Sequence, residues 1–205
     1  MSENTQKKGV SGPVLSRPVI FAMLRENFEK LPEIDQKFCT YGPAYLAGNG
    51  ALAGLVANSL YRRALNVRQA RFASSLPMAV LPFISTYGLY NAIVSVPLMS
   101  GDLNCPSCAL MRGALVGALG AGLYPIILAL PVNLGLASMY STAPLPEKGA
   151  MFRFWVDLSR PILNKMRVVL VLQAFFGTYL ASRDFKTYTK LVEITFGSVK
   201  EELTD

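Results

Sequence analysis

The 205-residue sequence contains no histidine and only three cysteines. Without histidine it cannot use Ser–His–Asp or Cys–His catalysis, and it offers no imidazole ligand for zinc or haem. Three cysteines are too few for a disulfide-stapled miniprotein or for a metal site of four thiolates. The acidic residues all lie outside the apolar stretches, so no carboxylate pair is placed for acid–base chemistry. We therefore expect neither enzymatic activity nor a cofactor.

Charged residues are also scarce. They make up 16% of the chain, while hydrophobic residues make up 52% and the mean hydropathy is +0.35. A soluble domain carries about 25% charged residues, so this composition indicates a membrane protein and excludes a disordered chain, a coiled coil and a collagen-like fibre. The net charge of +7 favours an anionic partner, either lipid or nucleic acid.

Four stretches without charge, at 40–61, 72–101, 113–146 and 168–182, predict membrane-spanning helices. The first would be about 33 Å long as a helix, enough for a hydrocarbon core of about 30 Å. The last is short and reaches that length only from residue 162, where Lys165 and Arg167 would snorkel to the headgroups. A re-entrant or interfacial fourth segment is the alternative. The predicted fold class is an all-α membrane protein, a bundle of about four kinked transmembrane helices at about 40–61, 72–100, 113–140 and 162–182.

Proline and glycine recur within these stretches. Prolines in the second and third stretches predict kinks, either as packing features or as a broken-helix transport site; we favour packing, because no carboxylate accompanies them. Small residues at a spacing of four allow helix backbones to approach closely in lipid. The glycines that we expect to pack helices are Gly50, Gly54, Gly113 and Gly117.

The loops predict a topology. Loop 62–71 carries four basic and no acidic residues, and segment 147–167 carries five basic and two acidic. In a four-span bundle these two loops lie on the same side, and the positive-inside rule places that side in the cytoplasm or the mitochondrial matrix.

Two tails flank the predicted bundle. The N-terminal tail, 1–39, contains an amphipathic helix from Arg17 to near Leu31, which would lie on a membrane or on a partner. We see no cleavable signal peptide and no convincing transit peptide in it. In the C-terminal tail, 183–205, apolar residues share a weaker helical face, which fits a docking helix and a solvated tail equally well.

Two loop motifs could carry chemistry. Cys105 and Cys108 form a CxxC pair, for which a structural disulfide is favoured over redox catalysis, because no thioredoxin-like strand–helix context surrounds it. The simplest role of the arginines in loop 62–71 is to set the topology, and the alternative is phosphate contact with anionic lipid or RNA. These arginines are Arg62, Arg63, Arg68 and Arg71.

Ordered motifs along most of the chain resemble the transmembrane protein 126 family. They are Leu55-Val56-Ala57-Asn58-Ser59-Leu60-Tyr61-Arg62-Arg63, Leu76-Pro77-Met78-Ala79, Gly101-Asp102-Leu103 with Cys105 and Cys108, Gly122-Leu123-Tyr124-Pro125, Leu130-Pro131-Val132-Asn133 and Leu145-Pro146-x-Lys148-Gly149. The Gly-Asp-Leu loop and the Pro-Val-Asn run are closer to the A branch of that family, whereas Arg17-Pro18-Val19-Ile20 and Ala143-Pro144-Leu145-Pro146 are closer to the B branch.

The resemblance implies a multi-pass protein of the mitochondrial inner membrane, for which the positive-inside rule predicts the first and third loops in the matrix. It implies a non-enzymatic assembly factor for the membrane arm of respiratory complex I, whose partners are membrane-arm subunits and other assembly factors. The arginine loop adds anionic lipid such as cardiolipin as an expected partner. An alternative that it also implies is cooperation with the inner-membrane insertase and the mitochondrial ribosome. From the residues alone, a CxxC redox protein or a small-solute transporter remains the rival from another class.

Overall fold

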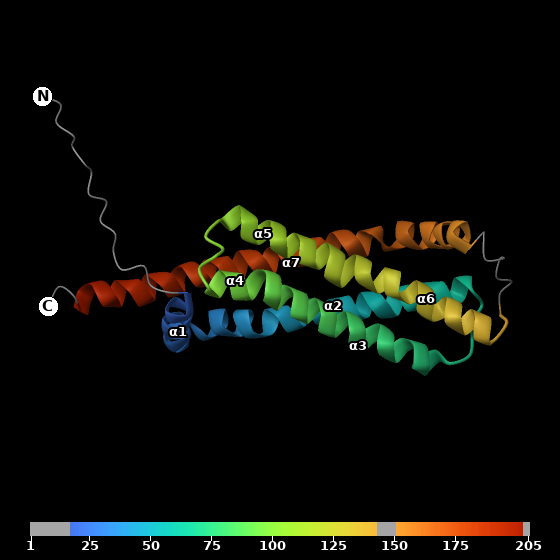
Figure 1. Ribbon diagram of the computed structural model, residues 1–205, viewed down its shortest axis with the longest axis horizontal. Helices are drawn as coiled ribbons and strands as arrows, with labels where there is room; N and C mark the ends of the chain where they lie inside the picture. The colour runs from blue at the N-terminus through green and yellow to red at the C-terminus, as the bar shows by residue number, and fades with distance from the viewer. Residues whose placement is uncertain (1–16, 143–150, 203–205) are drawn as a thin grey trace, which may run out of the picture.

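The computed structural model describes residues 17–142 and 151–202, and all its regular elements there are helical (Figure 1). The all-α class is thereby confirmed. The elements are α1 (Arg17–Asn27), the 3₁₀ turn η1 (Phe28–Lys30), α2 (Glu33–Ala64), α3 (Arg71–Tyr90), the π-helical η2 (Asn91–Ser95), α4 (Val96–Met99), α5 (Pro106–Leu115), the π-helical η3 (Val116–Leu123), α6 (Tyr124–Met139) and α7 (Met151–Glu202). The polar start of the N-terminal tail and the motif at 143–149 lie outside the described residues.

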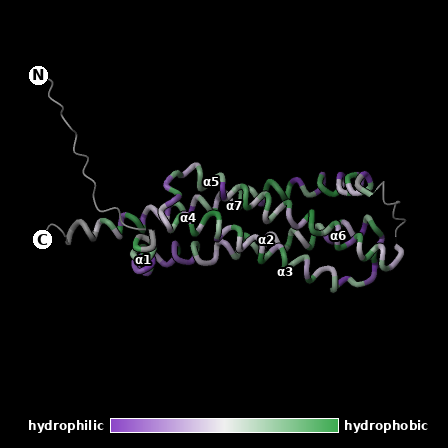
Figure 2. The backbone as a smooth tube through the Cα atoms, viewed as in Figure 1, coloured by the Kyte–Doolittle hydropathy of each residue, from purple (hydrophilic) through white to green (hydrophobic). Residues whose placement is uncertain are grey.

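Four long helical runs lie side by side: α2, α3 to α4, α5 to α6, and α7 (Figure 1). The turn between α2 and α3, the end of α6 and the start of α7 lie at one end of the bundle. Helix α1, the connection between α4 and α5, and the C-terminal part of α7 lie at the other. Hydrophobic residues dominate the length between the two ends (Figure 2).

Two of the four runs, Arg71–Met99 and Pro106–Met139, are long and apolar enough to cross a membrane, judged by length and composition. Both coincide with expected spans, although the second begins seven residues before 113. Helices α2 and α7 contain more charged residues, and their passage through a membrane remains a proposal.

Each π-helical segment ends two residues before a proline. The backbone N–H of Val96, which precedes Pro97, donates to the carbonyl of Asn91. The N–H of Tyr124, which precedes Pro125, donates to the carbonyl of Leu119 in the same way. Proline lacks an N–H and its ring crowds the preceding turn, so a shift to bonds spanning five residues lets the run continue past it. A widened turn thus accommodates each of these two prolines, and the helical run continues without a break.

The described parts of both tails pack on the bundle. Helix α7 continues without interruption from the expected fourth span through residue 202, so residues 183–202 extend the same helix. One buried cluster contains Leu24 of α1, Leu31 just after η1, and Leu191 of α7. The N-terminal amphipathic helix therefore packs partly on its own chain. The apolar face of the tail at Leu191 is docked, because Thr187 and Thr195 beside it are buried too.

Glycines lie where the runs touch most closely. A Cβ at Gly54 would overlap the Met78 carbonyl of α3, and one at Gly113 would overlap the Gly177 carbonyl of α7. Gly117 faces the Gln173 carbonyl in the same manner. Gly50 lies against Ala121, whose Cα would be 3.1 Å from a Cβ at position 50. These four small-residue faces are therefore occupied within the chain and are not open to a partner helix.

We predict opposite effects for two alanine substitutions on α2. Gly54→Ala should destabilise the bundle by about 1–3 kcal/mol, because the new methyl group meets a backbone oxygen that cannot rotate away. Gly48→Ala is the matched control: nothing lies within 4 Å of its built Cβ, and alanine favours the helix by about 0.5–1 kcal/mol. Thermal unfolding of the purified chain in detergent measures both. Equal unfolding temperatures for the two variants would contradict the close packing of α2 on α3.

Candidate functional site

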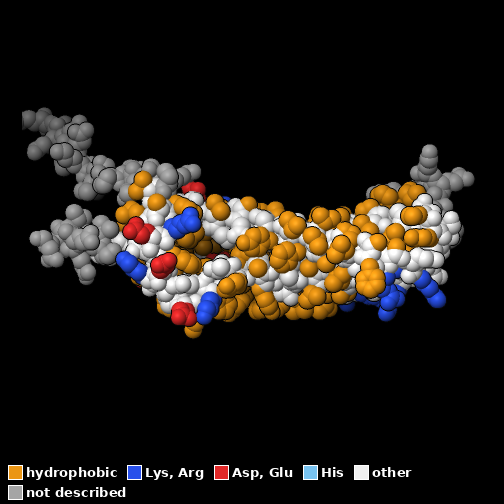
Figure 3. All heavy atoms as spheres, turned by 90° about the horizontal axis from the view of Figure 1, so that it is seen from below, with side chains coloured by type: hydrophobic (Ala, Val, Ile, Leu, Met, Phe, Trp, Pro, Cys, Tyr) orange, Lys and Arg blue, Asp and Glu red, His pale blue; other side chains and the backbone are white. Residues whose placement is uncertain are grey.

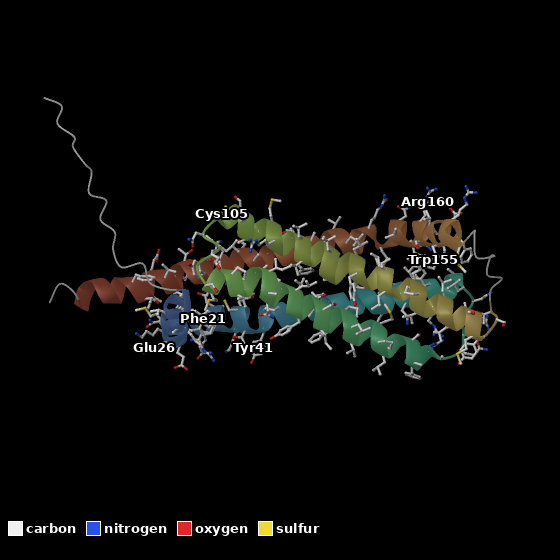
Figure 4. The ribbon with its side chains drawn as sticks, in the orientation of Figure 1. Phe21, Glu26, Tyr41, Cys105, Trp155 and Arg160 are labelled. Carbon is white, nitrogen blue, oxygen red and sulfur yellow. The ribbon has the colours of Figure 1, made fainter. Side chains whose placement is uncertain are left out.

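The described residues of the two basic regions begin at the same end of the bundle (Figure 1). On the face drawn in Figure 3, Lys and Arg side chains alone mark that end, while both signs of charge mark the opposite end and hydrophobic side chains cover the length between. Trp155 and Arg160, from the first turns of α7, lie at the basic end (Figure 4). The charge distribution is thus strongly asymmetric along the long axis.

A pocket of about 530 Å³ lies at the turn between α2 and α3. We call it the arginine pocket, because all four arginines of loop 62–71 line it and no acidic residue does. Its lining residues are Leu55, Asn58, Ser59, Arg62, Arg63, Asn66, Val67, Arg68, Arg71 and Ser75. The structure therefore brings these arginines into one polar concavity, which sequence spacing alone does not show.

Arg62 differs from the other three arginines. Its side chain is buried, and its guanidinium donates to the Ser74 hydroxyl at 2.7 Å and to the carbonyls of Gln69 at 2.8 Å and Ala70 at 3.3 Å. Burial, and after it the charge of Arg71, lower the pKa of Arg62, although arginine stays protonated in proteins. Arg62 thus braces the turn before α3.

The three remaining arginines, Arg63, Arg68 and Arg71, are exposed at the surface. Within the described residues none of their guanidinium groups makes a hydrogen bond or an ion pair. Their charges are therefore available to an external anion.

A buried amide network extends from the pocket into the bundle. Asn58 of α2 donates to the hydroxyls of Ser74 and Ser75 on α3, at 3.2 and 3.3 Å. Asn133 of α6 donates to the Asn58 side-chain oxygen and to the Ala129 carbonyl, both at 2.8 Å. Hydrogen bonds between helices are the polar contacts that an apolar environment favours, so this network joins α2, α3 and α6.

A second polar centre lies at the opposite end. Asp184 of α7 is buried and accepts a hydrogen bond from the Tyr90 hydroxyl at 2.8 Å and a weaker one from the Cys39 thiol at 3.6 Å. Burial raises the pKa of Asp184 to about 6, against the lowering effect of these two hydrogen bonds. Burial, aided by the neighbouring Asp184, raises the pKa of the Cys39 thiol to about 12. The centre borders a small cavity of about 170 Å³, which Ser95 also lines.

An ion-pair cluster stands beside this centre. Asp35, near the start of α2, is buried and pairs with Lys190 at 2.7 Å and with Arg183 at 3.6 Å, both on α7. The Arg183 guanidinium also lies over the Phe38 ring, 4.9 Å from its centroid, a favourable cation–π position. These contacts fasten the extension of α7 to the first turns of α2.

The CxxC pair lies at this end of the bundle, at the start of α5 (Figure 4). Both thiols are exposed, and no disulfide joins them. The Cys105 sulfur accepts a hydrogen bond from the backbone N–H of Cys108 at 3.4 Å. Hydrogen bonds from Cys108 lower the pKa of Cys105, and the same partnership raises that of Cys108. Within the described residues no group of three or more Cys, Asp or Glu side chains could hold a metal ion, so the pair does not extend to a metal site.

Sequence reasoning did not single out Asn58, Asn133, Tyr90 or Asp184. The two asparagines carried a usable signal, because an amide within an apolar stretch requires a partner there. Asp184 and Tyr90 carried none: they are 94 residues apart, and only the fold shows that they meet.

We predict a pH-dependent stability that originates in Asp184. The folded chain keeps this proton up to about pH 6, whereas an unfolded chain releases it near 3.8. The folded state therefore binds more protons between these values, and stability falls as the pH rises through them. Asp184→Asn removes the titration and keeps an acceptor for Tyr90.

Unfolding temperatures of wild type and Asp184→Asn, followed through Trp155 fluorescence, measure this effect. The difference, wild type minus variant, should decrease from about pH 4 to 6.5 and then level off. Glu193→Gln, at an exposed carboxylate of the same helix, serves as the control and should follow the wild type. A difference that stays constant over this range would contradict an Asp184 proton held by burial.

We also predict distinct reactivity for the three thiols. In the reduced folded chain, Cys105 and Cys108 should react with a maleimide–polyethylene glycol, because both are exposed, while Cys39 should react only after unfolding, since its thiolate is suppressed. After mild oxidation and without reductant, we expect no rapid labelling, because the proposed disulfide joins Cys105 to Cys108. The Cys105→Ser, Cys108→Ser double variant isolates Cys39. Rapid labelling of two thiols after oxidation would rule out the disulfide.

Comparison with known proteins identifies the family. A family model described as "Transmembrane protein 126" matches residues 18–198. The chain is 48% identical to transmembrane protein 126A of Mus musculus over 176 residues, which is 86% of this chain and 90% of the relative. It is 42% identical to transmembrane protein 126A of Homo sapiens over 172 residues, 84% of this chain and 88% of the relative.

A second branch is more distant. "Complex I assembly factor TMEM126B, mitochondrial" of Rattus norvegicus is 31% identical over 163 residues, 80% of this chain and 70% of the relative. No solved structure matches the chain. The match to the family model and the identities to both branches show that the chain belongs to the transmembrane protein 126 family and is closer to its A branch.

Proposed function

We propose that the protein is a non-enzymatic assembly factor for the membrane arm of respiratory complex I, resident in the mitochondrial inner membrane. The observation that carries this proposal is membership of a family in which the B-branch proteins, at about 30% identity, are named mitochondrial complex I assembly factors. A helical bundle with an apolar length and charged ends is compatible with that role. In the proposal the factor stabilises newly inserted subunits until they join their neighbours.

The proposed contact with a subunit uses the outward apolar faces of the bundle. Gly50, Gly54, Gly113 and Gly117 are occupied by contacts within the chain, so they do not serve a client helix. The outer face of α2 instead exposes Tyr41, Tyr45, Leu52 and Val56. Tyrosine and leucine at helical spacing present a broad surface to an apolar segment.

We propose that the end bearing the arginine pocket faces the matrix. The support is the position of both basic regions at the same end (Figure 3) together with the positive-inside rule. In this orientation the pocket faces the side from which the mitochondrial ribosome and the insertase deliver subunits.

The test is loss of the protein in cells that express it and lack a compensating relative. We expect depletion of membrane-arm intermediates of complex I on native gels, with the other respiratory complexes unchanged and recovery on re-expression. Re-expression of the Cys105→Ser, Cys108→Ser double variant should restore assembly fully, because the proposed role needs no thiol chemistry. Normal complex I assembly in such cells would overturn the proposal, and failure of the serine variant alone would favour a redox role.

A further inference from the structure

An apolar groove adjoins the arginine pocket. The groove has a volume of about 480 Å³ and runs along the start of α3, lined by Leu55, Phe72, Ala73, Ser75, Leu76 and Ala79. It shares Leu55 and Ser75 with the arginine pocket. The two spaces therefore lie next to each other, the cationic one at the turn and the apolar one along the start of α3.

The apolar part is open to the surroundings. The Phe72 side chain is 89% exposed and that of Leu76 is 70% exposed. Helix α3 runs from the basic end toward the middle of the bundle (Figure 1), so successive turns of the groove lead from the level of the arginines into the apolar length. A ligand that fills both parts carries an anion at one end and a hydrocarbon chain at the other.

We infer that this combined site binds an anionic phospholipid, with its phosphate in the arginine pocket and one acyl chain in the groove. Arg63, Arg68 and Arg71 supply the charge, because they are exposed and have no acidic partner among the described residues. Asn66 and Ser59 line the same pocket and add neutral polar groups for the ester and glycerol oxygens. Arg62 holds the turn in place through the carbonyls of Gln69 and Ala70.

The groove decides between lipid and RNA. An RNA strand offers phosphates to the arginines, but its polar sugars would leave Phe72 and Leu76 exposed to water. The pocket also lies where the apolar run of α3 begins, the depth at which headgroups meet the hydrocarbon region. An acyl chain in the groove covers the apolar side chains, so a phospholipid satisfies both halves of the site.

The experiment uses the purified full chain, delipidated in a neutral detergent, and measures lipid binding by native mass spectrometry and by the shift of the unfolding temperature. The probes are phosphatidylglycerol and cardiolipin, phosphatidylcholine with the same chains, glycerol phosphate without chains, and a short single-stranded RNA. We expect the two anionic lipids to bind at least tenfold more tightly than phosphatidylcholine or glycerol phosphate. Equal affinity for phosphatidylcholine, or for glycerol phosphate, would overturn the inference.

Variants locate the site. Arg68→Gln combined with Arg71→Gln should weaken anionic lipid binding by about tenfold or more, since charge-assisted contacts to phosphate are lost. Arg153→Gln, an exposed arginine of α7 that lines neither space, is the matched control and should bind as the wild type. Ala79→Phe should fill the groove and weaken lipid binding while leaving the weak binding of glycerol phosphate unchanged.

The site would be contradicted if the Arg68→Gln, Arg71→Gln double variant or the Ala79→Phe variant bound anionic lipid as tightly as the wild type. It would also be contradicted if the double variant lost RNA binding and kept lipid binding. That result would assign the arginines to RNA. Lipid binding is measured on the isolated chain, so its result does not depend on the proposed role in complex I assembly.

Discussion

Close approach of helix backbones at glycine is the constraint on which the bundle depends. In lipid, neighbouring helices gain little from excluding water, so packing and polar contacts between helices must hold them together. Gly113, Gly117 and Gly177 bring the α5–α6 run and α7 within reach of each other's carbonyls, and Gly54 does the same for α2 and α3. The buried network of Asn58 and Asn133 joins α2, α3 and α6 near one end. Close glycine contacts and this network thus both hold α2 against α3.

The ion-pair cluster and the arginine pocket lie at opposite ends of the bundle, and the two ends differ in kind. At one end Asp35, Arg183, Lys190 and Asp184 engage one another or near neighbours, which closes the extension of α7 onto α2. At the other, three arginines of the arginine pocket have no acidic partner among the described residues. These four side chains at one end thus pair within the chain, whereas the three arginines at the other end are exposed.

The sequence predicts the helical runs better than their ends or contacts. Absence of charge marks the apolar core of each run, and the observed Arg71–Met99 run agrees with the expected span at 72–100. The charges at Arg183 and Asp184 predict the end of the fourth span at 182; the helix itself continues past them, where Asp35 pairs with Arg183 and Tyr90 donates to Asp184. Partners so distant in the sequence leave no local pattern, so periodicity cannot predict that a charged residue is buried.

The arginine loop shows the same limit within a candidate site. Four arginines in ten residues are visible in the sequence as a single group, and all four line one pocket. Arg62 braces the turn, while the other three arginines are exposed. This difference depends on the conformation of the turn, where Asn66 and Ala70 adopt positive φ values of 55° and 52°. In that conformation the carbonyls of Gln69 and Ala70 accept hydrogen bonds from Arg62. The sequence alone does not predict these hydrogen bonds.

The conformation of this turn carries a cost that bears on the pocket. Left-handed backbone at Ala70 costs roughly 1–2 kcal/mol, and four guanidinium groups around one concavity repel each other. The hydrogen bonds of Arg62 offset part of the backbone cost by satisfying carbonyls before α3. They leave the repulsion among the other three arginines in place, since neutral acceptors cancel no charge. No carboxylate is among the described residues that line the pocket, so an external anion bound there would lower that repulsion.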